Sequence, residues 1–200
     1  MKIPFTTAVL GCVLAGACLL ELNNAEAAAK AAPSTIQRVD NGITPLSLGG
    51  QNLIGVRSRR ENFNAHSFEV VSFYFRDTSD AKPELNLVPI FGTEKGKHEE
   101  RYEITVSGGA DCLLHDFRLV KGQGKQPARL VVAHRTMGDS YVTPGAVQFV
   151  YYDLMQNEEG IPGNPPLYFE EKSRTNSRQK YCDVNEAFDQ ELKMGTSSGQ

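Results

Sequence analysis

The sequence contains no tryptophan and no excess of basic residues, although it has ten phenylalanines and seven tyrosines. Lysine and arginine number 21 against 24 aspartates and glutamates, which gives a formal net charge of -3. Proteins that neutralise phosphates normally carry a basic excess, so this balance argues against nucleic acid as a partner. The chain also lacks a phosphate-binding loop and a dinucleotide fingerprint. A hydrophobic share of 40% is nevertheless enough for a sizeable core, which excludes a wholly disordered chain.

The first segment of the chain has the features of a secretory signal. Residues 3–20 carry no charge and are largely apolar, and Ala25-Glu26-Ala27 follows as a cleavage signal with small residues where signal peptidase needs them. The apolar stretch is at the short limit for a membrane span and is rich in Gly, Ala and Thr. We therefore expect residues 1–27 to be a cleaved signal peptide, and the mature protein to be periplasmic or secreted.

A lipoprotein remains an alternative. The stretch from Leu14 to Cys18 resembles a lipobox with one residue too many, because Ala15 stands where Leu or Val is usual. An acyl chain on Cys18 would tether an otherwise soluble domain to a membrane. We expect membrane contact only in that case.

Cysteine is scarce, and removal of the signal peptide leaves only Cys112 and Cys182. One pair in an oxidising compartment predicts a disulfide between them. The bond would close a loop of roughly 70 residues, for which the chain-entropy model gives about 4 kcal/mol of stabilisation. The alternative is two separate buried thiols. The chain has no C-x-x-C motif, so the sequence does not indicate a redox-active pair.

Most of the chain consists of short stretches in which hydrophobic and polar residues alternate, with turn-forming clusters between them. In residues 68–77, for example, Val71, Phe73 and Phe75 share one parity. The other stretches of this type are residues 85–91, 102–106, 112–121, 129–136, 147–154 and 167–171. The first of these stretches contains Pro89, which indicates an edge strand because proline has no N–H to donate to a neighbouring strand. Short strands at this spacing predict an all-β fold, either an antiparallel sandwich or an open barrel.

One short C-terminal helix is expected directly after Cys182. Asp183 can cap its N-terminus, and Gly195 is the expected stop. The helical face would carry Val184, Ala187, Phe188 and Leu192. A disulfide at Cys182 would then attach the start of this helix to the strand that begins at Cys112.

The expected organisation of the mature chain is simple. Residues 28–34 are rich in alanine and end in Pro33-Ser34, which predicts a mobile linker. Residues 35–195 form a single β-rich domain, in which no internal repeat stands out. Residues 196–200 follow the expected helix stop and are predicted to be a frayed tail.

Two histidines are expected to face each other on a β-hairpin. Burial fixes the face that each side chain takes, and a register that pairs Leu119 with Leu130 also sets His115 opposite His134. Opposed residues have Cβ atoms about 5 Å apart, so the two imidazoles could share a transition metal or act as a pH-sensitive pair. Ordinary half-buried histidines are the alternative, and our expectation is that the protein holds no cofactor. A third metal ligand would come from Asp111, Asp116 or Asp139.

A long connection rich in proline and glycine, residues 157–166, leads into two aromatic residues. Loops of this length in a compact domain are often functional. Tyrosine combines an apolar body with a polar tip and is therefore suited to interfaces. The residues of this candidate binding loop are Pro162, Pro165, Pro166, Tyr168 and Phe169. The alternative is a plain connection whose aromatic residues complete the core.

Three short segments carry a resemblance to known families. The runs Ala110–Phe117 and Tyr181–Phe188 are similar to small exported proteobacterial proteins, among them the carbapenem intrinsic-resistance proteins. Ser107-Gly108-Gly109-Ala110 is loosely similar to the Ser-Gly-Ala loop of periplasmic lysozyme inhibitors, which are small β proteins with disulfides. No defined motif of either family matches residue by residue. The resemblance implies an exported protein and assigns no site residue.

Together, these patterns favour a non-catalytic binding or protective factor of the bacterial envelope, of the inhibitor, immunity or antibiotic- or stress-resistance type. Its ligand would be a protein or a small molecule of the envelope. One alternative is a metal-dependent hydrolytic enzyme that uses His115 and His134, and another is a structural component of an envelope assembly. Catalysis is disfavoured because carboxylate doublets such as Glu99-Glu100 point to opposite faces of a strand and make no acid–base pair. The sequence leaves the ligand and the oligomeric state open.

Overall fold

The computed structural model describes residues 36–77, 83–108, 111–124 and 126–195. The expected signal peptide, the linker at 28–34 and the tail at 196–200 lie outside these ranges. The described residues belong to one compact unit. None of their helices is long and apolar enough to cross a membrane.

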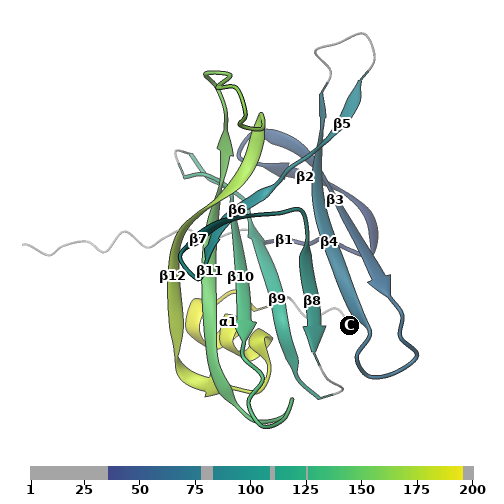
Figure 1. Cartoon of the computed structure of the whole chain (residues 1–200), viewed down its shortest axis with the longest axis vertical. Coiled ribbons are helices and arrows are strands. Elements are labelled where there is room, and N and C mark those ends of the chain that lie inside the picture. The colour runs from purple at the N-terminus through teal and green to yellow at the C-terminus, as the bar shows by residue number, and fades with distance from the viewer. Residues whose placement is uncertain (1–35, 78–82, 109–110, 125, 196–200) are drawn as a thin grey trace, which may run out of the picture. The chain divides into compact units, whose positions relative to one another are not determined.

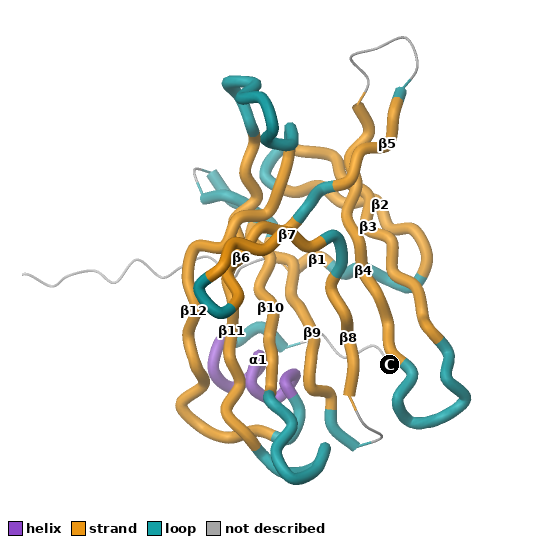
Figure 2. Tube along the Cα trace, viewed as in Figure 1, coloured by secondary structure: helices purple, strands orange, loops and turns teal. Residues whose placement is uncertain are grey.

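The described part of the chain is almost entirely β-structure, which confirms the all-β prediction (Figures 1 and 2). The strands run in the order β2-β3-β4-β8-β9-β10-β11-β12-β6-β7, with β1 added to β9 and β5 added to β4. Neighbouring strands are antiparallel, except that β12 and β6 are parallel. The bounds are β1 Ile36–Gln37, β2 Gly42–Leu48, β3 Gln51–Arg60, β4 Phe68–Asp77, β5 Glu84–Leu87, β6 Ile90–Glu94, β7 Lys97–Arg101, β8 Ile104–Gly108, β9 Leu113–Val120, β10 Arg129–Arg135, β11 Gly145–Gln156, β12 Leu167–Tyr181 and α1 Val184–Leu192.

The sheet buries side chains on both of its faces. On one face, which we call the inner face, Phe117 and Leu119 of β9 join a large core in which Phe73 packs edge-on against Phe117 and Phe169. On the opposite face, helix α1 covers β9, β10 and β12 (Figure 1). There Phe149 packs against Phe188. Alternation along β9, β10 and β11 therefore sorts residues between an inner core and a helix-covered core.

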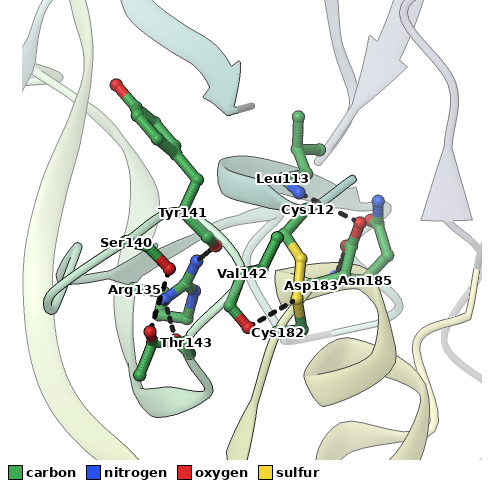
Figure 3. Close-up of a disulfide and its surroundings, with 10 residues drawn as sticks. All are labelled: Cys112, Leu113, Arg135, Ser140, Tyr141, Val142, Thr143, Cys182, Asp183 and Asn185. Carbon is green, nitrogen blue, oxygen red and sulfur yellow. Dashed lines mark hydrogen bonds between the residues drawn. A yellow bond between two sulfur atoms is a disulfide. The ribbon is translucent and has the colours of Figure 1, made fainter. Parts of the chain in front are cut away.

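The disulfide between Cys112 and Cys182 is confirmed, with Cα atoms 5.5 Å apart (Figure 3). It joins the start of β9 to the start of α1. Asp183 is the N-cap, and its side chain accepts hydrogen bonds from the backbone N–H of Asn185 at 2.7 Å and of Leu113 at 3.1 Å. The helix ends at Leu192 because Lys193 adopts a left-handed conformation with φ 56°, so the chain leaves the helix before the expected stop at Gly195.

The single stretch expected at residues 85–91 is two strands in the structure. β5 pairs with β4, whereas β6 pairs with β12 and β7, so the chain passes from one part of the sheet to another at Val88-Pro89. Proline has no N–H to donate to a ladder, but the Pro89 carbonyl accepts a hydrogen bond from Phe169 N at 2.9 Å. The proline therefore marks the point where the strand breaks.

Four strands, β1, β2, β3 and β7, were not predicted from the sequence, and one is much longer than expected. β2 and β3 were not recognised, and β3 contains Gly55, where a Cβ would come within 2.8 Å of the Val39 side chain. β7 is almost wholly charged, and β12 continues past the expected end at Glu171 through a polar run to Tyr181. The side chains of β7 and of β12 beyond Glu171 are mostly exposed, so these two segments lack the hydrophobic alternation on which the prediction depended.

Candidate functional site

His115 and His134 lie side by side on the inner face of the sheet. The register predicted for the hairpin is confirmed, because Leu119 pairs with Leu130 and His115 pairs with His134. The two Nδ1 atoms are 2.9 Å apart, which is the distance of a hydrogen bond between the rings. The pair therefore lies directly beside the inner core, where the side chains on this face change from apolar to polar.

Both imidazoles are held in the neutral form at neutral pH. Burial, together with smaller contributions from His115 and from the positive charges of Arg101 and Arg174, lowers the pKa of His134 to about 4. Burial also lowers the pKa of His115, with a contribution from Arg135. In a neutral pair, one Nδ1–H donates to the other Nδ1. It follows that one Nε2 is an acceptor and the other is a donor.

A cavity of about 600 Å³ opens beside the histidine pair. Its apolar wall comes from the inner core, including Ile90, Ile104 and Val132. Its polar wall comes from β7, β8 and β11 as well as from the two histidines: Arg101, Ser107 and Tyr152. Ligand sites of proteins are typically cavities of this kind, in which an apolar lining carries a few converging polar groups.

Arg101 is held at the cavity by two carboxylates. Its Nε donates to Glu99 at 2.8 Å, and its Nη2 donates to Glu99 at 2.5 Å and to Glu94 at 3.1 Å. These contacts fix the plane of the guanidinium group and balance its charge. Within the described residues its Nη1 has no hydrogen-bond partner, so two N–H donors remain for a ligand.

Tyr152 contributes a hydroxyl to the same cavity. The side chain is 2% exposed, and burial raises the pKa of the phenol, so the hydroxyl keeps its proton. β6 approaches closely because residue 92 is a glycine: a Cβ at Gly92 would lie 3.4 Å from the Tyr152 Oη and 3.0 Å from Glu171. The β6–β7 hairpin thus crosses the inner face (Figure 1), and its Ile90 and Arg101 line one side of the cavity.

The candidate binding loop lies away from this cavity. None of its five residues is among the residues that line the cavity described here. Phe169 is fully buried in the inner core, with its ring centroid 5.4 Å from that of Phe73. Tyr168 packs edge-on against Phe91. The Asn157 amide donates to the carbonyls of residues 161 and 164, so the loop around Pro162, Pro165 and Pro166 is held by its own side chain.

The aspartates considered as a third metal ligand do not join the histidines. Asp116 follows His115 directly and points to the helix-covered face, where it accepts a hydrogen bond from Arg118 at 2.7 Å. Across the described ranges, no group of three or more His, Cys, Asp or Glu side chains is arranged to hold a metal ion. A metal bound by His115 and His134 stays a prediction.

Sequence analysis missed the partners of the histidine pair. Arg101 and Tyr152 are 51 residues apart in the sequence. The local pattern around each residue does not predict that the two lie close together. Pairing of β11 with β12, and of β12 with β6, brings them together. Only the glycine at position 92 in an otherwise strand-like segment could have indicated a close approach.

Comparison with known proteins gives one structural likeness. The crystal structure of CarG matches with a TM-score of 0.59 and 21% sequence identity, over 81% of this chain and 99% of that chain. No protein-family model matches the sequence, and no curated protein matches it either. At this level of identity, the likeness to CarG shows a shared fold.

Proposed function

We propose that this protein is a non-catalytic binding or protective factor of the bacterial envelope, and that it holds its ligand in the cavity beside His115 and His134. The observation that carries the proposal is the convergence of polar groups on an apolar cavity. Arg101 Nη1 and the Ser107 hydroxyl have no hydrogen-bond partner among the described residues. A few polar groups that converge on an apolar cavity are typical of a ligand site.

Placement in the envelope is supported by two features. The first 27 residues have the pattern of a secretory signal. The disulfide between Cys112 and Cys182 fits an oxidising compartment. Together they favour a periplasmic or secreted protein.

A binding role is favoured over catalysis by the contacts of the residues that might react. Ser107 is opposed to His115 in the β8–β9 ladder, but no hydrogen bond joins their side chains. The Nδ1 of His115 is engaged by His134, so no acidic group orients the ring. An activated nucleophile needs a base within hydrogen-bond reach and a third group that orients the base.

The proposal is tested by filling the cavity. Thr105 lines the cavity from the exposed side of β8, so Thr105→Trp should fill it without disturbing the core. Ser173→Trp is the matched control, because Ser173 is exposed and pairs with Tyr151, which packs against the helix-covered core. Each protein is incubated with a deproteinised small-molecule extract of the periplasm and examined by native mass spectrometry. We expect a bound mass on the wild type and on Ser173→Trp, and none on Thr105→Trp.

Equal binding to Thr105→Trp, or no bound mass on any protein, would overturn the proposed site. Elemental analysis of protein purified without chelator tests the alternative function. A stoichiometric transition metal that is lost in His134→Gln would favour the metal-dependent enzyme and contradict a non-catalytic role.

A further inference from the structure

A row of uncharged polar side chains crosses the inner face at the level of the histidine pair. Strand pairing places its members opposite one another, from β8 through β9, β10 and β11 to β12. Ser107 pairs with His115, His115 with His134, His134 with Gln148, and Gln148 with Asn176. Four strand spacings of about 4.8 Å give the row a length of about 19 Å. A row of this length can contact an extended ligand along several units, and it is longer than a single small group requires.

The row begins in the cavity and ends in solvent. Ser107 and both histidines line the cavity, Gln148 is half-buried and Asn176 is exposed. Directly beside the row, on the same face, Phe117 and Val132 belong to the inner core. A ligand lying along the row would therefore have one end enclosed and the other open.

The chemistry of the row is that of neutral donors and acceptors. A hydroxyl and an amide each offer both a donor and an acceptor, and the histidine pair offers one donor and one acceptor through its two Nε2 atoms. Neither Gln148 nor Asn176 has a side-chain hydrogen-bond partner among the described residues. The arginines that flank the row are already paired, Arg101 with Glu99 and Arg174 with Glu171. The row therefore matches a ligand that carries many hydroxyl or amide groups and no net charge.

An aromatic ring stands at the rim of the cavity. Tyr102 lies in the connection between β7 and β8, lines the cavity and is 53% exposed. Exposed tyrosine offers a flat apolar face together with a polar tip. The apolar face of a sugar ring can lie on such a surface while its hydroxyl groups reach the polar row.

We propose that the cavity and the polar row bind a neutral glycan chain, of the class whose sugars carry hydroxyl and acetamido groups. This inference rests on the proposed function, because it takes the cavity as the ligand site. Sugar hydroxyl groups both donate and accept, as the row requires. An extended peptide is disfavoured because peptides add to the edge of a sheet through backbone hydrogen bonds, whereas this row crosses the middle strands. An anionic chain is disfavoured because Glu94 and Glu99 already pair with Arg101, and Glu171 pairs with Arg174.

The probe for this inference is the tetramer of N-acetylglucosamine, titrated into the full mature protein and followed by NMR chemical-shift changes and calorimetry. Gln148→Leu removes one amide from the row, and Gln179→Leu is the matched control on an exposed glutamine of β12 outside the row. We expect the tetramer to bind the wild type and Gln179→Leu equally. Gln148→Leu should bind about tenfold more weakly, as expected when one ligand hydrogen bond is lost. Asn176→Leu should weaken the tetramer and leave the monosaccharide unaffected, because Asn176 lies at the open end.

A second probe tests the neutral character of the ligand. Tetragalacturonate has the same number of sugars but carries a carboxylate on each, and it should not compete. Equal binding of tetragalacturonate, or equal affinity of Gln148→Leu and the wild type for the tetramer, would overturn the inference. If the tetramer does not bind while the Thr105→Trp experiment still shows a ligand in the cavity, the glycan class is wrong and the proposed function stands. If both experiments fail, both proposals fall.

Discussion

Arg118 is a buried charge that connects helix α1 to the sheet, and its removal should be among the most damaging single changes. The residue is 3% exposed and lies on the helix-covered face of β9. Its guanidinium donates to Asp116 at 2.7 Å, to the Asn185 side chain at 2.5 Å and to the Met194 carbonyl at 2.9 Å. The guanidinium carbon also lies 4.3 Å from the ring centroid of Phe188.

The expected loss of stability in Arg118→Met follows from the groups that lose their partner. The methionine can fill much of the space, but Asp116, only 7% exposed, loses its counter-ion. Breaking one partner of a buried ion pair costs about 3–5 kcal/mol, chiefly because the remaining charge is uncompensated. The double variant Arg118→Met/Asp116→Leu removes both charges, and we expect it to be more stable than the single variant. It should stay below the wild type because the bonds to Asn185 and Met194 are lost as well.

Urea unfolding followed by far-UV circular dichroism measures these differences in the free energy of unfolding. Arg38→Met is the control, because Arg38 pairs with Asp40 where both side chains are more than half exposed. Exposed pairs contribute about 0–1 kcal/mol, so this variant should remain close to the wild type. The reasoning is refuted if Arg118→Met costs less than about 1 kcal/mol, or if the double variant is less stable than the single one.

The remaining predictions concern the disulfide and the histidine pair. Replacing both Cys112 and Cys182 by Ser should lower the free energy of unfolding by about 4 kcal/mol, from the entropy of a loop of roughly 70 residues; a urea midpoint equal to that of the oxidised wild type would contradict this. Stability should also fall as the pH drops from 7.5 to 5, because a histidine of the unfolded chain binds a proton near pH 6.5, whereas native His134 does so near pH 4. The loss at pH 5 should be at most about 2 kcal/mol, and it should shrink in His134→Gln. Identical pH profiles for the two proteins, measured by urea titration at each pH, would exclude His134 as the cause.

Local patterns in the sequence were sufficient for several parts of the fold. Alternation along residues 113–120 and 129–135 determined the faces of β9 and β10, and the register of this hairpin followed from matching buried positions. Asp183 was recognisable as a helix cap because its side chain acts on the next turn of the same segment. The disulfide followed from counting, since two cysteines remain after the signal peptide.

The structure differs from the sequence predictions where the side chains show no hydrophobic alternation. β7 and the second half of β12 are formed by polar residues that pair through their backbones, so they have no hydrophobic period to detect. Phe169 looked like part of a binding loop because it follows one, yet it completes the inner core. The pairing of polar strands and the burial of Phe169 depend on which distant segments pack together. The local sequence pattern contains no information about that packing.

What the sequence determined by itself is the set of local elements that place His115 opposite His134, together with the cysteine pair. Only the tertiary structure decided what stands beside the histidines. Arg101 reaches the site because β12 pairs with β6 in parallel, and this long-range pairing brings the β6–β7 hairpin across the inner face. The physical reason is that side-chain periodicity reports burial within one strand, whereas a cavity is formed where strands distant in the sequence approach one another and leave space between them.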